Sequence, residues 1–241
     1  MQIVITMAGL GTRFRKAGYD MPKYEIKVHG RSLFAWSMES LRGYDDPDNE
    51  YYFIVRKEDK AEDFIRNEWK DIEGIGTIKI IEIDTMTDGQ ATSALLAAPF
   101  WKKEEPLLVY NIDTYVEAGQ LKTADIKGDG FIPCFNAPGD HWSFVKTDEN
   151  GVAVSVKEKV RISDNCTLGA YYFSSCGLYE TMYEEYYTKG GNLDAGERYI
   201  APLYNHMISG GMKVAICLVD ASSVHVLGTP EELEAFAKAK I

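Results

Sequence analysis

The chain has 241 residues, of which 45% are hydrophobic and 26% are charged, and its formal net charge at pH 7 is −11. This length and composition are typical of a globular protein that can bury a sizeable core. Nucleic-acid binding depends on neutralising phosphates with Lys and Arg, so an acidic chain without a basic stripe is a poor candidate for it. We therefore expect no nucleic-acid partner.

The sequence shows no targeting signal for a membrane or for secretion. It has no run of eighteen apolar residues and no basic segment before its first apolar run, so we expect neither a membrane span nor a signal peptide. The four cysteines are scattered and form no CxxC pair: Cys134, Cys166, Cys176 and Cys217. We expect them to be buried free thiols, which favours the reducing cytoplasm.

The first half of the chain alternates strand-like and helix-like segments. Apolar runs predict strands at residues 3–5, 51–55, 77–83 and 107–110, and helical spacing predicts helices at 32–41, 58–69 and 90–101. This order predicts an α/β fold with a doubly wound, mostly parallel, Rossmann-like sheet and helices on both faces. In such folds ligands bind at the carboxyl ends of the strands.

The second half changes character. Predicted strands with short turns between them cover residues 131–135, 142–147, 152–156 and 168–173, and they suggest an antiparallel excursion from the parallel sheet. Helices are predicted at 177–187 and 197–208, a strand at 213–219, and a last helix from Thr229. Thr229 is a good N-cap because Pro230 and two acids follow it. We expect one domain over residues 1–241.

A glycine-rich motif follows the first predicted strand. Gly9 and Gly11 let backbone N–H groups approach a ligand closely. Arg13 adds a planar cation and Lys23 a mobile one, and this set suits several phosphate oxygens. The motif is not a GxxxxGK[ST] loop, and Phe14 stands where GxGxxG needs its third glycine. An ordinary tight turn would also explain the glycines taken alone.

The spacing of this loop, Arg13 and the pair Pro22-Lys23 is more specific. It resembles the signature of sugar-phosphate nucleotidyltransferases, the nucleoside-diphosphate-sugar pyrophosphorylases. The resemblance implies an enzyme that joins a nucleoside triphosphate (NTP) and a sugar phosphate into a nucleoside-diphosphate sugar (NDP-sugar) and pyrophosphate, with Mg²⁺ as cofactor. It implies a nucleotide-binding half at residues 1–115 and a sugar-phosphate-binding half at 116–241.

The resemblance also implies roles for individual residues of the loop. Arg13 would act on the β- and γ-phosphates and Lys23 on the reacting α-phosphate. The nucleotide-binding residues implied in the loop are Ala8, Gly9, Gly11, Thr12 and Arg13. The matched segments run from Gly9 to Glu231 in the family's order, so the resemblance covers nearly the whole chain.

A second motif occupies residues 87–94, between a predicted strand and a predicted helix. In the family a similar segment of glycine and small residues lies along the nucleobase. The resemblance therefore implies that Gly89, Gln90 and Thr92 bind the base. The alternative is a plain helix start in which Asp88 serves as the N-cap.

Asp113 closes the apolar strand predicted at 107–110. A carboxylate at the carboxyl end of a parallel strand can hold Mg²⁺ while phosphate oxygens complete its shell. The family places its metal-binding Asp at this point, usually after a glycine, whereas Ile112 precedes it here. The alternative is a simple turn residue.

Three weaker matches lie in the second half. The resemblance places Glu158 near the sugar and Lys159 on the incoming phosphate, although Val160 replaces the family's Pro. It also implies that Gly169 lies beside the sugar and that Glu197, at the start of a predicted helix, contacts sugar hydroxyls. An exposed charged strand, a core strand and a first-turn acid are the structural alternatives.

The closing segment, residues 225–231, also resembles the family, but Val226 stands where the family often has a second metal-binding Asp. The second protein ligand is then missing, moved to Asp220 or Glu158, or replaced by water and phosphate. We expect His225 to point to the other face of its strand.

Three other functions remain open on the sequence alone. The acceptor could be a phosphorylated alcohol such as phosphocholine or glycerol phosphate, as in related cytidylyltransferases. The divergence at Val226 also allows a non-catalytic subunit that senses nucleotide or sugar phosphate. A glycosyltransferase using a ready-made nucleotide sugar would commonly carry Asp-x-Asp, and residues 111–113 read Asn-Ile-Asp. The nucleobase, the sugar and the oligomeric state are not specified.

Overall fold

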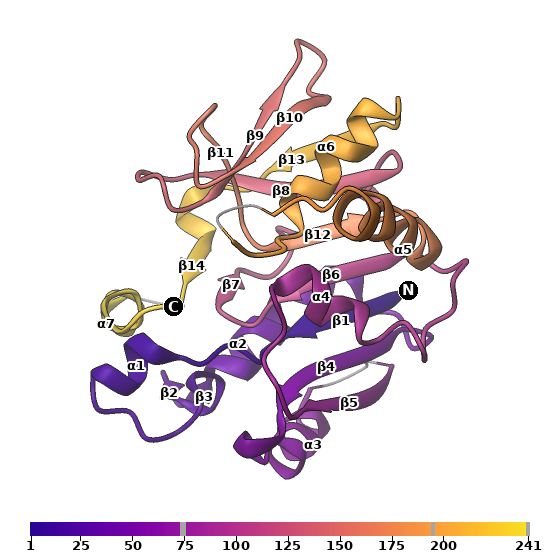
Figure 1. The fold of residues 1–241 in the computed structure, drawn as a ribbon. Helices are drawn as coiled ribbons and strands as arrows, with labels where there is room; N and C mark the ends of the chain where they lie inside the picture. Colours follow the sequence, from indigo (N-terminus) through magenta and orange to yellow (C-terminus); the bar gives the residue numbers. More distant parts are fainter. Residues whose placement is uncertain (73–75, 194–195, 240–241) are drawn as a thin grey trace.

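In a computed structural model, which describes residues 1–72, 76–193 and 196–239, one ten-stranded mixed sheet runs through both halves of the chain (Figure 1). The part built from the first half of the chain is parallel, in the order β6-β1-β4-β5. These strands are β1 (Gln2–Thr6), β4 (Glu50–Arg56), β5 (Thr77–Ile83) and β6 (Leu107–Asn111). The parallel, doubly wound half expected from the sequence is confirmed.

The other part of the sheet is largely antiparallel. From β6 it continues through β12 (Ala170–Phe173), β8 (Gly130–Asn136), β11 (Asn165–Thr167), β9 (Ser143–Thr147) and β10 (Ala153–Glu158). A further strand, β13 (Val214–Leu218), pairs in parallel with β8. Figure 1 shows β9, β10 and β11 projecting above the parallel strands. This is the antiparallel excursion that the short turns predict. One of its strands, β11, was not predicted from the sequence.

Two small sheets lie beside the main one. One joins β7 (Thr114–Val116) to β14 (Val224–Val226), and the other joins β2 (Lys27–Val28) to β3 (Arg31–Ser32). The first brings the chain's closing segment next to the end of β6, because Val226 pairs with Thr114.

Helices cover both faces of the sheet. They are α1 (Thr12–Lys16), α2 (Leu33–Glu39), α3 (Glu62–Lys70), α4 (Gln90–Leu95), α5 (Cys176–Tyr183), α6 (Ala201–Ser209) and α7 (Pro230–Lys238); α5 continues as a π-helix, Glu184–Lys189. Short 3₁₀ turns occur at Lys23–Glu25, Ser40–Tyr44, Lys57–Asp59, Thr123–Asp125 and Ala221–Ser223.

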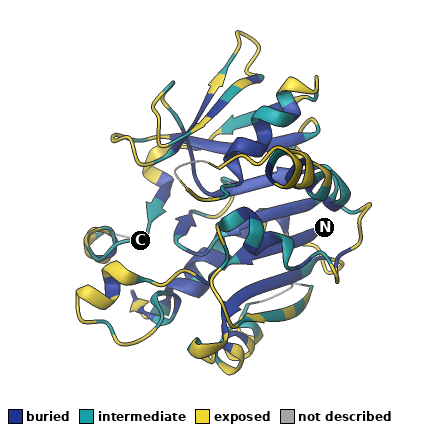
Figure 2. Ribbon diagram, viewed as in Figure 1, coloured by how far each residue is buried: buried dark blue, intermediate teal, exposed yellow. Residues whose placement is uncertain are grey.

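The two faces follow from the alternation of side chains along a strand. Ile3 and Ile5 of β1 pack in one core cluster with residues of α2 and α3, whereas Val4 packs in the other with residues of α4, α5 and α6. Because both faces are covered, the central strands read as continuous apolar runs. Figure 2 shows them buried along most of their length, whereas α1 is exposed apart from the buried Phe14.

The helix predicted at 58–69 begins only at Glu62, after the 3₁₀ turn Lys57–Asp59. Two other predicted helices are also shorter in the structure, and proline explains both. The helix predicted at 90–101 ends at Leu95, four residues before Pro99, in keeping with the avoidance of helical backbone before proline. The helix predicted at 197–208 begins only at Ala201, because Pro202 fits the first turn of a helix but not its interior. Glu197 therefore precedes α6, and the prediction that it starts the helix is wrong.

The last helix begins as predicted. The Thr229 side chain accepts a hydrogen bond from the backbone N–H of Glu232, and Pro230 is in the first turn. The four cysteines are free, with Cys217 half-buried and the others buried. Among the described residues, no helix is long and apolar enough to cross a membrane.

Candidate active site

The phosphate-type loop and Asp113 leave the sheet at the same edge. Strands β1 and β6 are parallel neighbours, and Thr6 at the end of one pairs with Asn111 at the end of the other. The loop of residues 7–11 and Asp113 follow directly from these two ends. The strand order therefore brings together two motifs that lie about a hundred residues apart.

Lys23 and Asp113 form an ion pair at this edge. Lys23 Nζ donates to Asp113 Oδ2 over 2.7 Å, and their side chains are only 15% and 31% exposed. Burial alone would raise the pKa of Asp113. The Lys23 ammonium and, more weakly, Arg13 outweigh it and hold the pKa of Asp113 below its ordinary value. Asp113 is therefore an ionised carboxylate at neutral pH, as a metal ligand must be.

A cavity of about 410 Å³ lies at this edge, and we call it the Gly89 cavity. Its lining includes Ala8, Gly9, Lys23, Met86, Gly89, Gln90, Ser93, Asn111, Asp113, Glu197 and Tyr199. Four of the eight predicted nucleotide-binding residues therefore line this cavity: Ala8, Gly9, Gly89 and Gln90. Glu197, predicted on the sugar side, lines this cavity instead.

Thr92 is oriented differently from the sequence prediction. Its hydroxyl bonds to the Asp88 carboxylate and lies 2.7 Å from the hydroxyl of Tyr183 on α5. The residues of α4 that line the cavity are Gln90 and Ser93, on either side of Thr92 in the sequence. The sequence pattern located the segment, but the phase of a helix of six residues decided which side chain faces the cavity.

Gly89 has a structural reason to be glycine. Its φ of +150° lies in a region that residues with a side chain rarely adopt, and an ideal Cβ would overlap the backbone of Arg198. Two backbone hydrogen bonds hold this contact, from Arg198 N to Asp88 O and from Ala91 N to Arg198 O, both 2.9 Å. Close approach of a second chain segment therefore accounts for Gly89 without any base.

A second cavity of about 250 Å³, the Gly169 cavity, adjoins the first. Its lining includes Arg13, Gln90, Asn111, Asp113, Ser143, Glu158, Gly169, Tyr171, Tyr199, Val226, Gly228 and Glu232. Four residues line both cavities: Gln90, Asn111, Asp113 and Tyr199. Asp113 thus stands where the two cavities meet, and the predicted acceptor residues Glu158 and Gly169 are on the far side from Gly89.

A third cavity of about 240 Å³, the Gly11 cavity, opens beside the ion pair. It is lined by Gly11, Thr12, Arg13, Phe14, Lys23 and Gly228. Gly11 has a φ of +59°, the left-handed conformation that glycine adopts without strain, and it turns the loop into α1. Gly11, Thr12 and Arg13 therefore line a cationic recess next to Lys23.

Lys159 reaches the site through Tyr199. Its Nζ donates to the Tyr199 hydroxyl over 2.6 Å and lies 4.5 Å from the centre of the Tyr199 ring. This hydrogen bond raises the pKa of Lys159 above its ordinary value. Because Tyr199 lines both main cavities, a half-exposed ammonium lies one side chain away from them.

A solved structure resembles this chain over its full length. The nucleoside-diphosphate-sugar pyrophosphorylase from Vibrio cholerae RC9 is 34% identical to it, with a TM-score of 0.90 over 98% of this chain and 100% of that one. This chain belongs to the nucleoside-diphosphate-sugar pyrophosphorylase family. The family expected from the loop, Arg13 and Pro22-Lys23 is confirmed.

Two further structures of lower identity share the fold. They are the inositol-1-phosphate CTP transferase from T. maritima, with a TM-score of 0.76, and a putative glucose-1-phosphate thymidylyltransferase from Bacillus anthracis in complex with a sucrose, with a TM-score of 0.75. Each is 16% identical to this chain; the matches cover all of it and 97% and 96% of the two other chains. The sequence matches no protein-family model and no curated protein.

In this pyrophosphorylase family member, the two acids predicted as alternatives to a metal ligand at Val226 lie in different surroundings. Asp220 accepts from the backbone N–H of Ser222 and caps a 3₁₀ turn, whereas Glu158 lines the Gly169 cavity. The sequence analysis overlooked Glu232, whose carboxylate also lines that cavity. Within the described residues, its buried Oε2 atom has no hydrogen-bond partner. Glu232 lies three residues after the N-cap Thr229, in the first turn of a helix that begins shortly after β14. This position could have indicated a site residue.

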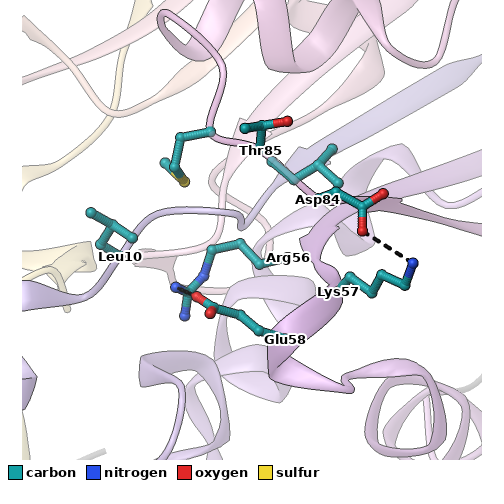
Figure 3. Close-up of a pocket in the computed structure, with 8 residues that line it drawn as sticks. Leu10, Arg56, Lys57, Glu58, Asp84 and Thr85 are labelled. Carbon is teal, nitrogen blue, oxygen red and sulfur yellow. Dashed lines mark hydrogen bonds and ion pairs between the residues drawn. The ribbon is translucent and has the colours of Figure 1, made fainter.

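A fourth cavity of about 330 Å³, the Leu10 cavity, adjoins the Gly89 cavity through Met86 (Figure 3). Leu10 and Met86 are exposed apolar side chains at its rim. Below them lie Arg56, bonded to Asp59 over 3.1 Å, and the ion pair of Lys57 with Asp84 at 3.0 Å. This cavity lies at the carboxyl ends of β4 and β5, and none of the site residues predicted from the sequence lines it.

Proposed function

We propose that the protein transfers a nucleotidyl group from an NTP to a sugar phosphate, releasing pyrophosphate and an NDP-sugar. The observation that carries this proposal is the Lys23–Asp113 pair at the junction of the Gly89 and Gly169 cavities. Two ligands can bind on either side of it, with a cationic recess alongside. The family membership supports the same reaction, because the Vibrio cholerae relative is named for it.

In the proposed reaction an oxygen of the sugar phosphate attacks the α-phosphorus of the NTP. A new P–O bond forms, the bond between the α-phosphorus and the bridging oxygen breaks, and that electron pair leaves with pyrophosphate. No covalent enzyme intermediate is needed, so positioning and charge neutralisation can supply the catalysis. Arg13 in the Gly11 cavity would hold the β- and γ-phosphates, and Lys23 would oppose charge at the α-phosphate.

The second cavity supports a binding place for the acceptor. Glu158 and Gly169 line it and would contact the sugar. Lys159 would bind the incoming phosphate, with Tyr199 holding its ammonium close to the junction. Glu197 lines the Gly89 cavity instead, so we assign it to the NTP.

We propose Mg²⁺ as the cofactor, held by Asp113. The residues fit this ion, because an ionised carboxylate, a second carboxylate with a buried unpaired oxygen and space for phosphate oxygens meet at one place. When bound, Mg²⁺ supplies neutralisation of phosphate charge. We also place the activity in the cytoplasm, in keeping with the four free thiols.

A sugar phosphate is favoured over a phosphorylated alcohol as acceptor. The relative at 34% identity is an NDP-sugar pyrophosphorylase, whereas the inositol-1-phosphate CTP transferase at 16% is similar in fold alone. A purely sensory role is not favoured either, because Arg13, Lys23 and Asp113 lie together at the junction.

A pyrophosphate-release screen tests the proposal. Four NTPs would be combined with a panel of sugar phosphates and alcohol phosphates in the presence of Mg²⁺. We expect release with one or a few NTP and sugar-phosphate pairs, and none when either substrate is left out. Release only with alcohol phosphates would replace the acceptor class, and no release with any pair would contradict the proposed function.

A further inference from the structure

We propose that Glu232 supplies the second carboxylate of the metal site in this chain, and that the cation lies in the space beside Gly228. This inference rests on the proposed function, because it concerns the same divalent cation. It assigns a ligand at a position other than Val226, where a valine side chain cannot bind a metal.

The first turn of α7 holds the Glu232 side chain, and one of its carboxylate oxygens is buried. The Thr229 hydroxyl accepts from the backbone N–H of Glu232 over 3.2 Å, which fixes the first turn of α7. This turn directs the Glu232 side chain into the Gly169 cavity, where its Oε2 atom is buried without a partner among the described residues. An unpaired buried carboxylate oxygen is costly unless a cation or a donor arrives.

Gly228 leaves a small space open beside the carboxylates of Asp113 and Glu232. An ideal Cβ built on Gly228 would lie 3.4 Å from Asp113 Oδ2 and 3.5 Å from Glu232 Oε2. Both carboxylates therefore face the same small volume, which the absence of a side chain leaves open. The backbone of Gly228 is outside the left-handed region, so its conformation does not require glycine.

Backbone hydrogen bonds hold residues 226–227 against the segment that carries Asp113. Leu227 N donates to Asp113 O over 2.8 Å, and Val226 pairs with Thr114 in the small sheet of β7 and β14. Glu232 and Asp113 are thus fixed relative to each other by backbone hydrogen bonds just before α7 begins.

The chemistry favours a divalent cation over an organic donor. Mg²⁺ prefers carboxylate oxygens and needs only one or two of them, with water and phosphate completing its shell. In the described structure Lys23 already contacts Asp113, and Arg13 lines the same cavity, yet neither cation contacts Glu232 Oε2. The remaining partner for this oxygen is then a ligand that Asp113 can share.

The test measures the affinity of the full chain for Mn²⁺ in the absence of substrates. Electron paramagnetic resonance detects the bound Mn²⁺. The variants are Glu232→Gln, which keeps the shape of the side chain, and Glu231→Gln, its exposed neighbour, as the matched control. We expect Glu232→Gln to weaken Mn²⁺ binding by ~10-fold or more and Glu231→Gln to leave it unchanged. Val226→Asp in the Glu232→Gln background should recover binding.

Gly228→Ala is an independent probe of the same space. Its methyl group would make ordinary contacts with both carboxylate oxygens, so the thermal midpoint without metal should be close to that of the wild type. We expect Mn²⁺ binding to weaken, and the stabilisation that Mn²⁺ gives the wild type to be reduced. The thermal midpoints of all variants without metal show whether each one is folded.

The outcomes separate this inference from the proposed function. If Asp113→Asn abolishes Mn²⁺ binding while Glu232→Gln binds as well as the wild type, the inference is wrong and the metal role of Asp113 stands. If Glu232→Gln keeps Mn²⁺ but loses sugar-phosphate binding, Glu232 is a substrate residue and the inference is again wrong. If the wild type binds no Mn²⁺, both metal assignments fail, and the pyrophosphate screen decides the activity separately.

Discussion

Lys23 and Asp113 are 90 positions apart in the sequence, yet Lys23 Nζ lies 2.7 Å from Asp113 Oδ2. The two residues for which the sequence predicts a phosphate-binding and a metal-binding role are thus each other's partner in the structure. Under the proposed function, a cation at Asp113 would compete with the ammonium, and a phosphate would attract the ammonium away from the carboxylate. Binding of metal and nucleotide should therefore be coupled through this pair.

Lys23→Ala should reduce kcat by roughly 10²-fold or more, by analogy with the loss of one preorganised donor to a developing charge. Lys23→Arg should recover only part of the rate, because a planar guanidinium fork does not replace a compact ammonium. Initial rates with the pair found in the screen measure both. Near-normal turnover by Lys23→Ala would remove the assigned role of Lys23.

The structure changes the expected effect of the same substitution on stability. The sequence suggests an exposed loop lysine that contributes little, but the Lys23 side chain is only 15% exposed and is paired. Lys23→Ala should therefore lower the free energy of unfolding at pH 7 by roughly 1–3 kcal/mol, because Asp113 loses its partner. Urea denaturation measures this loss.

The loss should also depend on pH. In the wild type Asp113 has a pKa below its ordinary value of 3.8, so its contribution to stability is present above that value and fades as the pH falls through its lower folded pKa. The stability difference between wild type and Lys23→Ala should thus be largest near neutral pH and shrink below pH 3.8. A difference that grows toward low pH would show that the pair is not what Lys23→Ala removes.

Gly89→Ala should destabilise the fold by roughly 1–3 kcal/mol or more, since its Cβ would overlap the backbone of Arg198. Gly9→Ala is the control, because an ideal Cβ there meets no described atom within 4 Å. Urea unfolding of the two variants compares them directly. Equal stability of both would mean that the contact between Gly89 and Arg198 is absent in solution.

Thr92→Ala should leave the ranking of the four NTPs unchanged, contrary to the reading of the sequence alone. The Thr92 hydroxyl contacts Asp88 and Tyr183, so its loss should cost only about 1 kcal/mol of stability. Relative rates with the four NTPs test this. A changed ranking would return Thr92 to the base site.

The sequence predicted the parallel half of the fold well, because its central strands β1, β4 and β6 are buried along most of their length and read as apolar runs. Residues 77–83 were predicted as a strand with the bounds that β5 has, and the ends of β1, β4 and β6 differ by one residue from their predicted runs. The short edge element β11 has three residues and no pattern of its own, so it emerges only from pairing with β8 and β9.

The sequence predicted most residues of the candidate site but not which of them contact one another. Motif spacing located the loop, Lys23 and Asp113, and sheet topology then brought them together. The direction of the Thr92 side chain depends on how the short helix α4 is rotated, which the sequence pattern did not show. The position of Glu197 depends on where α6 begins, and Pro202 sets that start. Glu232 was overlooked because an acid in the first turn of a helix is usually explained by the helix itself.

The most direct test of the proposed reaction follows the atoms. A sugar phosphate labelled with ¹⁸O on its phosphate is incubated with the matching NTP, and the products are analysed by mass spectrometry. Transfer to the α-phosphorus predicts that all the label is in the NDP-sugar and that the pyrophosphate is unlabelled. Nucleoside monophosphate with unchanged labelled sugar phosphate, or no NDP-sugar with any pair, would contradict the account.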